Sequence, residues 1–367
     1  MKMHLMTLGL FAAVCLTEFG CGKVPMGSEV QRGPKWVIYT QKSGALPNNI
    51  VNCIAIDGDG GVWVGTDSGA ARFYNGAWST VEDSLLSYFI GCDVYVGCFT
   101  YANALVKSIC AGQSDIMWYG MERGGLILHN PYGGTSVWQR FTAPVLPDSE
   151  IYAVACDQIY TGEIWAGTYF GLARMIPTGN TVGKFMPVIK TYTVDNSPLT
   201  TNSITALAWG VITNTIWIGM ENNGVSSFNI TNQQWSQVYP LVSGIAGTVS
   251  SIAIDSSNTV WVASTGGIGV LDANVGYWVT YYPGGYAGGK LPVSSINAVT
   301  TDLGVTRWFG SNGGLTEFND ATWTLFNHLN CPLPSDEVTS VCYDRKGNLW
   351  IGTYGGVAEF NPLGTVQ

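Results

Sequence analysis

The chain has 367 residues, of which 46% are hydrophobic and 11% are charged, and it carries a formal net charge of -9. This apolar content excludes a disordered chain. The acidic balance excludes a nucleic-acid-binding protein, because phosphate binding needs clustered Lys and Arg. The 47 glycines and 14 tryptophans favour an all-β fold with many short strands.

Residues 1–20 have the pattern of a secretory signal peptide. Their mainly apolar stretch, Leu5 to Leu16, is too short to span a bilayer. Cys21 follows a small residue, as at the cleavage site of a bacterial lipoprotein, although Glu18 stands where such sites prefer Leu. We therefore predict lipidation of Cys21, with ordinary signal cleavage as the alternative, and assign residues 21–34 to a tether. The membrane is then contacted only through this anchor, and the protein is periplasmic, surface-bound or secreted.

One sequence string recurs along the rest of the chain. It consists of an apolar residue (Arg307 in the sixth copy), Trp, a second apolar or small residue and, in six of seven copies, Gly. The seven tryptophans are Trp63, Trp118, Trp165, Trp217, Trp261, Trp308 and Trp350. Their spacing of about 40–55 residues suits four-stranded propeller blades.

Each Trp string has a predicted strand before it and, except in the seventh repeat, two after it. The preceding apolar strand ends in a tight turn, and an Asp opens this turn in five repeats: Asp57, Asp157, Asp255, Asp302 and Asp344. A Gly-containing turn and a third strand follow the Trp string. The fourth strand carries a second aromatic residue: Trp78, Trp138, Tyr192, Trp235, Trp278 and Trp323. Because these aromatics recur once per repeat, we predict that they fill the core between neighbouring sheets.

The seventh repeat ends after Phe360 without a fourth strand, whereas residues 35–41 have the fourth-strand pattern ahead of the first repeat. We therefore predict an all-β fold, a seven-bladed β-propeller of four-stranded blades over residues 35–367. The N-terminal strand, residues 35–41, completes blade seven and closes the ring, which removes an exposed sheet edge. An open array of repeats is the alternative.

The full pattern, best seen from Leu46 to Ala70 and from Leu333 to Val357, resembles the bacterial two-component-regulator propeller repeat. The resemblance covers roughly residues 35–361. It implies a periplasmic or extracellular propeller, since the best-known members form the sensor half of hybrid histidine kinases, many of which respond to glycans. This chain has one propeller and no kinase sequence, so we expect no direct signalling by it alone.

Seven cysteines follow Cys21, and all but Cys331 divide into two groups. Cys92 and Cys98 share the long segment from Ser79 to Leu105, and they are the candidate disulfide. Four others fall inside predicted strands, where a cysteine is usually a small buried hydrophobe: Cys53, Cys110, Cys156 and Cys342.

Side chains for catalysis are scarce in this sequence. His129 and His328 are the histidines beyond the leader, and they do not occupy equivalent repeat positions. We therefore expect no catalytic residues, no metal site and no cofactor, and favour a protein that is not an enzyme. A propeller lyase or hydrolase remains the alternative, because similar propellers include an antibiotic-cleaving lyase.

The turns after the Trp strands break the repeat. In propellers these turns ring one mouth of the central channel, and a ligand without sevenfold symmetry must be met by residues that differ between blades. The candidate ligand-binding residues are Asp67, Glu122, Arg123, Tyr169, Phe170, Glu221, Asn222, Asn312 and Tyr354. Of these, the residues on blades two and three form the preferred wall. Two functions follow: a binding protein for a glycan or peptide, or a surface scaffold for envelope proteins.

Overall fold

The computed structural model describes residues 35–81, 89–93, 97–101, 105–130, 137–157, 159, 161–181, 184–236, 239, 247–271, 276–283, 291–302, 306–320, 322–344 and 346–362, with only the backbone of 89–93 and 97–101. The predicted signal peptide 1–20, Cys21 and the tether to residue 34 lie outside these residues. Within them, no helical segment is long and apolar enough to cross a membrane.

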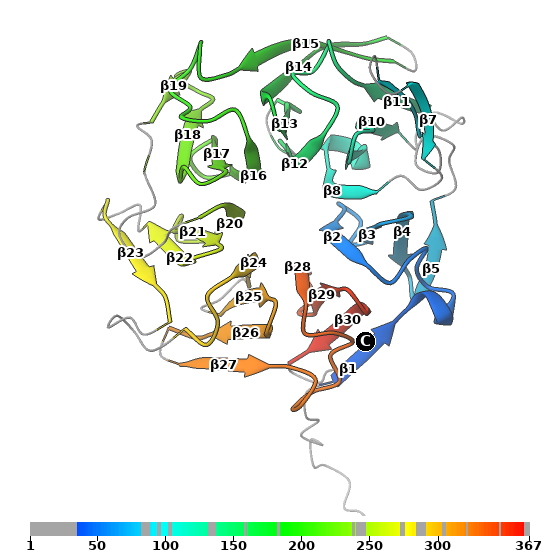
Figure 1. Ribbon diagram of the computed structural model, residues 1–367, viewed down its shortest axis with the longest axis vertical. Helices are drawn as coiled ribbons and strands as arrows, with labels where there is room; N and C mark the ends of the chain where they lie inside the picture. The colour runs from blue at the N-terminus through cyan, green and yellow to red at the C-terminus, as the bar shows by residue number, and fades with distance from the viewer. Residues whose placement is uncertain are drawn as a thin grey trace, which may run out of the picture.

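Seven four-stranded antiparallel sheets surround a common axis (Figure 1). Blade one comprises β2 (Val51–Ile56), β3 (Val62–Thr66), β4 (Gly69–Tyr74) and β5 (Ala77–Thr80). Blade two comprises β8 (Val106–Ala111), β9 (Met117–Met121), β10 (Gly125–Asn130) and β11 (Val137–Phe141). Blade three comprises β12 (Ile151–Cys156), β13 (Ile164–Thr168), β14 (Gly171–Thr181) and β15 (Lys184–Tyr192). The first strand of each blade is the innermost (Figure 1).

The other blades repeat this plan. Blade four comprises β16 (Ile204–Gly210), β17 (Thr215–Met220), β18 (Val225–Asn229) and β19 (Gln234–Trp235). Blade five comprises β20 (Val249–Ile254), β21 (Val260–Ser264), β22 (Gly267–Leu271) and β23 (Trp278–Tyr281). Blade six comprises β24 (Ile296–Thr301), β25 (Arg307–Ser311), β26 (Gly314–Phe318) and β27 (Trp323–Phe326). Blade seven comprises β28 (Val338–Tyr343), β29 (Leu349–Thr353), β30 (Gly356–Asn361) and β1 (Lys35–Tyr39).

Strand β1 closes the ring, as the sequence predicted. It pairs antiparallel with β30 from Lys35 opposite Asn361 to Tyr39 opposite Val357. The strand ends at Tyr39 rather than at residue 41, because Thr40 caps a short 3-10 turn that begins at the next residue. The seventh sheet thus joins the two ends of the propeller.

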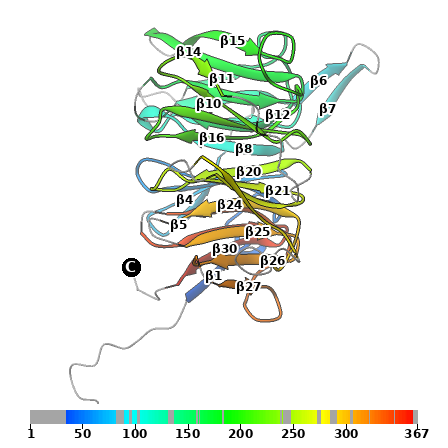
Figure 2. The ribbon, with the colours of Figure 1, turned by 90° about the vertical axis from the view of Figure 1, so that its left-hand side faces the viewer.

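The long segment between blades one and two forms a separate two-stranded sheet. Its strands are β6 (Phe89–Asp93) and β7 (Gly97–Tyr101), which project from the ring in Figure 2. Their register sets Cys92 opposite Cys98. The side chains of both residues lie outside the described part of the structure, so their disulfide stays a prediction.

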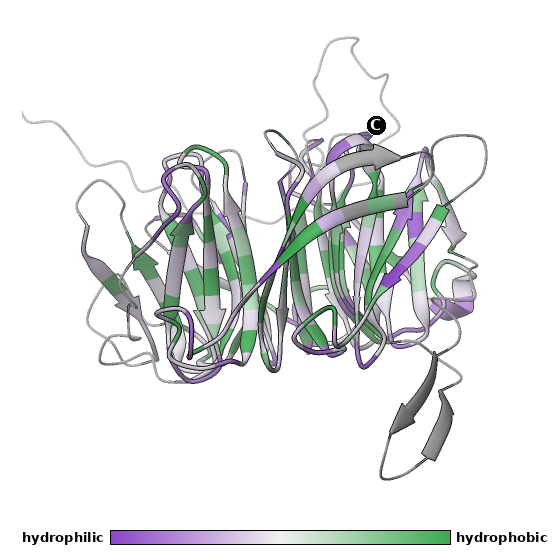
Figure 3. Cartoon of the chain, turned by 90° about the horizontal axis from the view of Figure 1, so that it is seen from above, coloured by the Kyte–Doolittle hydropathy of each residue, from purple (hydrophilic) through white to green (hydrophobic). Residues whose placement is uncertain are grey.

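The apolar core lies between neighbouring blades. All seven tryptophans of the recurring string are at most 9% exposed, which confirms their predicted core role. Figure 3 shows apolar residues along the strands and hydrophilic residues at many of the turns. The four strand cysteines are free thiols that are buried or half-buried, in agreement with the sequence expectation.

The recurring Asp fixes both the turn and the tryptophan. Asp57 accepts hydrogen bonds from the backbone N–H groups of Asp59 (3.1 Å) and Gly61 (2.6 Å) and from Trp63 Nε1 (2.7 Å). Asp255 and Asp344 accept in the same way from Trp261 and Trp350, at 3.2 and 3.0 Å. A buried carboxylate with several donors is well compensated for its lost hydration.

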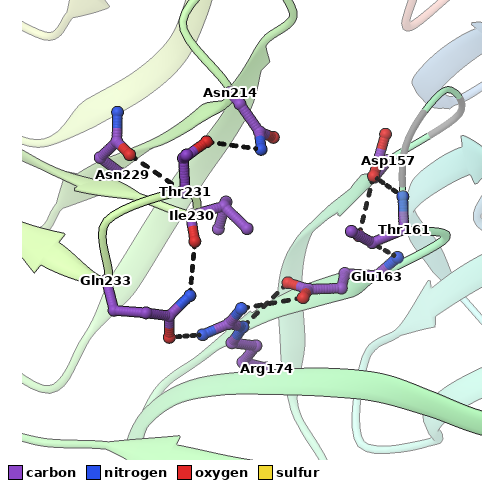
Figure 4. A network of polar contacts seen from close by, with 9 residues as sticks. All are labelled: Asp157, Thr161, Glu163, Arg174, Asn214, Asn229, Ile230, Thr231 and Gln233. Atoms are coloured by element: carbon purple, nitrogen blue, oxygen red, sulfur yellow. Dashed lines mark hydrogen bonds and ion pairs between the residues drawn. The ribbon is translucent and has the colours of Figure 1, made fainter.

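A buried ion pair in blade three also hydrogen-bonds to blade four. Arg174 Nε and Nη2 each lie 2.8 Å from the carboxylate of Glu163, and both side chains are almost completely buried (Figure 4). Arg174 Nη1 also donates to Gln233 Oε1 on blade four at 2.7 Å. The guanidinium therefore pairs with a carboxylate of its own blade and donates a hydrogen bond to the next blade.

Candidate functional site

The turns between the second and third strands lie beside the start of the inner strands. The backbone N–H groups of Asp67, Glu122, Glu221 and Tyr354 donate to the carbonyls of Ile50, Leu105, Ser203 and Glu337, at 3.0–3.2 Å. Each acceptor directly precedes the first residue of an inner strand. We call this end of the ring the mouth and these connections the mouth turns.

A Gly together with a Thr or Ser of the repeat shapes the mouth turn in five blades, whereas Met121 and Met220 stand at the hydroxyl position in blades two and four. In blade three, the Thr168 hydroxyl donates to the carbonyl of Gly171 at 2.8 Å and accepts from the N–H of Phe170. Gly171 has a φ of 145°, and a Cβ there would meet the carbonyl oxygen of Tyr192 at 2.8 Å. Only glycine fits this backbone, so the two residues between Thr168 and Gly171 are free to vary.

A β-bulge displaces one residue near the start of every inner strand. The register shifts directly after the first paired residue in all seven blades. The bulged residues are Asn52, Lys107, Tyr152, Thr205, Ser250, Asn297 and Thr339. Bulges commonly redirect a side chain beside a functional site. We did not anticipate these residues from the sequence, although their variation within an otherwise repeated apolar strand is a usable signal.

On blades four to seven the bulged residues bond to the next blade. Thr205 Oγ1 donates to the carbonyl of Val249 at 2.6 Å, and Asn297 Nδ2 donates to that of Val338 at 3.0 Å. Ser250 and Thr339 make the same link, each at 2.5 Å. These polar groups join adjacent inner strands, so each uses a hydrogen-bond donor within the ring.

On blades one to three the bulged residues instead contact the mouth. Asn52 Nδ2 donates to Asp67 Oδ1 at 2.9 Å. Lys107 Nζ lies 3.6 Å from Glu122, 3.5 Å from Glu150 and 4.7 Å from the centre of the Tyr152 ring. Asn297 of blade six does both, because it also donates to Asn312 of a mouth turn, so bulged residues contact mouth turns on blades one, two and six.

Burial and nearby acidic residues raise the pKa of the Tyr152 hydroxyl. Partial burial raises the pKa of Tyr152 to about 12, and the charges of Glu150 and Glu221 add to this effect. A hydrogen bond with Glu150 acts in the same direction. Tyr152 is therefore a neutral hydroxyl at physiological pH, able to donate and accept hydrogen bonds.

A hollow of about 380 Å³ opens at the mouth on blades six, seven and one. We call it the mouth hollow, and it is lined by Asn52, Asn297, Asn312, Glu337, Thr339 and Tyr354. Two predicted residues, Asn312 and Tyr354, thus line one cavity, while Asp67 bonds to Asn52 in its wall. Asn297 Nδ2 also donates to Asn312 Oδ1 at 2.7 Å.

The remaining predicted residues lie on blades two to four, outside the mouth hollow. Tyr169 and Phe170 are 46% and 56% exposed, with their rings edge-on at 5.0 Å. Arg123 is exposed, with a positive φ of 57° that belongs to its turn. Asn222 Oδ1 lies 3.5 Å from Thr248 Oγ1 on blade five. The predicted wall on blades two and three therefore lies near Lys107 and Tyr152 and outside the mouth hollow.

The two histidines lie apart. The His129 ring on β10 stacks on Trp138 at 4.0 Å, between the outer strands of blade two. His328 lies in the segment before β28, where Asp336 accepts from its backbone N–H at 2.7 Å and contacts its ring nitrogen. Neither histidine lines the mouth hollow.

Solved structures share this fold. An extracellular domain of a hybrid two-component system from B. thetaiotaomicron matches with a TM-score of 0.71 and 21% identity, over 90% of this chain and 41% of that one. Streptogramin B lyase matches with a TM-score of 0.67 and 16% identity, over 91% and 99%. PorZ, a surface component of the type-IX secretion system of Porphyromonas gingivalis, matches with a TM-score of 0.63 and 17% identity, over 86% and 47%.

These likenesses concern the fold, and the chain spans less than half the length of the first and third structures. None of the curated proteins compared with the chain matches it in sequence. The family model for the two component regulator propeller matches residues 45–68 and 332–355, which lie on blades one and seven. The chain is a seven-bladed β-propeller in which one segment of blade one and one segment of blade seven match the two component regulator propeller.

Proposed function

We propose that this chain is an exported, non-catalytic binding propeller that recognises a glycan at its mouth. The observation that carries this proposal is the composition of the mouth hollow, where three asparagines, one threonine and the 50% exposed Tyr354 face one space. Carboxamides both donate and accept hydrogen bonds, as sugar hydroxyls do. An exposed aromatic ring supplies an apolar face for a sugar ring.

The polar groups on blades two to four support an extended ligand. Tyr169 and Phe170 offer a second exposed aromatic surface, beside the neutral Tyr152 hydroxyl and the Lys107–Glu150 pair. Export is supported by the matched B. thetaiotaomicron structures, which are extracellular domains. A peptide is the competing ligand class.

The proposal is tested by screening the mature protein on a glycan array and on a peptide array, then measuring the hit by calorimetry. We expect a glycan hit whose affinity falls in Tyr354→Ala and in Tyr169→Ala. Tyr277→Ala is the matched control, because Tyr277 is 57% exposed but lies beside β23, away from the mouth turns. All three changes should leave stability within about 0.5 kcal/mol, since they alter exposed side chains.

A hit confined to the peptide array would replace the glycan by a peptide at the same mouth. Full affinity in both mouth variants would contradict the mouth as the site. The Arg123→Ala variant extends the same test to the charged part of blade two, because Arg123 is exposed beside Glu122.

A scaffold is the second candidate function, and exposed aliphatic residues favour it. Ile159, Val211 and Ile212 are 57%, 45% and 67% exposed. They lie in the turns after the inner strands of blades three and four, at the end of the ring opposite the mouth. Apolar groups on neighbouring turns suit contact with an envelope protein. Pull-down with Ile212→Asp against the unaltered protein distinguishes this function from mouth binding.

A further inference from the structure

A groove of about 610 Å³ lies at the junction of blades seven and one. We call it the seam groove. Its lining includes Tyr39, Val62, Phe73, Asp344, Trp350 and Glu359, together with two lysines, Lys35 and Lys346. It also reaches Gly60 and Asn348, in the turns that follow the inner strands. The seam groove is therefore at the opposite end of the ring from the mouth.

Blade three shows how a guanidinium fills this position, as it does opposite the Trp of blades one and three. Leu128, Ser227, Val270 and Glu317 stand opposite the Trp in blades two, four, five and six. Arg174 pairs across the sheet with Trp165, and its guanidinium carbon lies 5.3 Å from the centres of both the Trp165 and Phe228 rings. Glu163 holds the guanidinium by two contacts of 2.8 Å (Figure 4). A guanidinium over aromatic faces beside a carboxylate is a favourable cation–π and ion-pair site.

The seam groove has the same aromatic frame. Trp350 and Tyr39 lie 5.9 Å apart at 15°, as Trp165 and Tyr192 lie 5.9 Å apart at 11°. Phe73 lies 5.2 Å from Trp350 at 50°, and Phe228 lies 5.6 Å from Trp165 at 51°. The rings that surround the guanidinium in blade three therefore recur at the seam.

The residue opposite the tryptophan differs, however. Trp350 pairs across the sheet with Glu359, whose Oε2 accepts a hydrogen bond from the Tyr39 hydroxyl at 2.9 Å. Asp344 also lines the groove and accepts from Trp350 Nε1 at 3.0 Å. The aromatic frame thus contains two carboxylates where blade three contains an arginine.

Two other blades show the two routes by which this chain supplies the guanidinium. In blade one, Arg72 pairs across the sheet with Trp63, lies 5.3 Å from its ring centre and donates to Asp57 at 2.9 Å. Blade five uses its neighbour, because Arg307 of blade six lies 4.9 Å from the Trp261 ring centre and 2.9 Å from Asp255.

Neither of these two positions holds an arginine at the seam. Glu359 stands in blade seven where Arg72 stands in blade one. Val62 stands in blade one where Arg307 stands in blade six, and Val62 lines the groove. Among the described residues, no ion pair to either Glu359 or Asp344 is present. Within this chain, Asn348 Nδ2 donates to Asp344 Oδ2 at 3.0 Å and the cations near Glu359 are Lys35 and Lys346, so the groove contains carboxylates and rings without a guanidinium of this chain.

We propose that the seam groove binds a guanidinium group, carried by an arginine side chain of a partner polypeptide. The guanidinium would pair with Glu359 and Asp344 and lie against the rings of Trp350 and Phe73, as Arg174 lies against Trp165 and Phe228 in blade three. The volume of about 610 Å³ exceeds what one side chain needs, so adjacent backbone of the partner also fits. This site is separate from the mouth, and its test does not depend on the glycan proposal.

The test is calorimetric titration of the mature protein with N-acetyl-arginine amide. N-acetyl-citrulline amide is the matched probe, since it has the same shape without the charge. We expect the arginine amide to bind at least tenfold more tightly than the citrulline amide. Equal affinity for the two probes, or no binding of the arginine amide at millimolar concentration, would overturn the proposal.

Substitutions at one position separate charge from folding. Glu359→Gln keeps the side-chain shape and should weaken arginine amide binding at least tenfold. Glu359→Arg should abolish binding, because the new guanidinium would pair with Asp344 as Arg72 pairs with Asp57. Asp195→Asn is the control, since Asp195 is an exposed carboxylate in the connection between blades three and four, away from the seam. Unchanged binding in Glu359→Gln, with all variants folded by circular dichroism, would refute the site.

The pH dependence gives an independent readout. Burial raises the pKa of Glu359 above its ordinary value of 4.5, and the nearby Asp344 charge adds to this. The Tyr39 hydrogen bond and the charges of Lys35 and Lys346 act in the opposite direction. As the pH falls from roughly 7 to 4, Glu359 gains a proton, so arginine amide affinity should decrease while the weak citrulline binding stays constant. Affinity that is flat across this range contradicts the assignment.

Discussion

Removal of the closure strand is the sharpest test of the fold. Strand β1 pairs with β30 over five residues and supplies two aromatic side chains to the core. Trp36 stacks on Phe360 at 4.2 Å, and Tyr39 lies 5.9 Å from Trp350. Deleting Lys35–Tyr39 removes these contacts and leaves β30 as an open edge, which invites aggregation.

The size of the effect follows from the burial. A fully buried aromatic side chain covers about 150–250 Å², and Trp36 and Tyr39 are about half-buried. At ~25 cal/mol per Å², the two side chains contribute about 4–6 kcal/mol together. The net backbone hydrogen bonds, about 0.5–1.5 kcal/mol each, roughly offset the conformational entropy of ordering the strand. The deletion should therefore cost about 4–6 kcal/mol.

The assay combines thermal melting by circular dichroism with size-exclusion chromatography. At about 2 °C per kcal/mol for a domain of this size, the melting temperature should fall by about 10 °C. Lys35→Ala is the control, because its side chain is exposed and the backbone pairing is retained. An unchanged melting temperature together with a monomeric elution volume would refute the closure argument.

Three further predictions concern single residues. Arg174→Met should cost about 3–5 kcal/mol in urea denaturation, because Glu163 is left buried and unpaired, and a midpoint equal to that of the unaltered protein would contradict this. The thiols of Cys53 and Cys342 should resist a disulfide reagent at about pH 8 until the protein unfolds, because burial raises the pKa of each to about 12; rapid labelling of the native protein would be the opposing result. Cys21→Ser should move the protein from the membrane fraction to the soluble fraction if Cys21 is lipidated, whereas equal solubility of both forms would indicate plain secretion.

The blade plan could be predicted from the sequence because it is local and repeated. Each blade must pack against a similar neighbour, so the core tryptophan, the Asp turn and the Gly of the mouth turn recur at fixed offsets. The missing fourth strand after Phe360 and the matching pattern before blade one together predicted closure. The strand end at Tyr39, rather than residue 41, depended on the cap formed by Thr40.

The candidate sites depended on contacts that the repeat does not encode. Strand alternation does not reveal that a bulge redirects Asn52 or Lys107, because a bulge changes the register by a single residue. Likewise, the arginine that pairs with Asp255 of blade five comes from blade six. That no arginine of this chain pairs with Glu359 is therefore visible only when neighbouring blades are compared in space. The sequence determined which residues repeat, whereas the tertiary structure decided which of the non-repeating residues share a cavity, since those come from different blades.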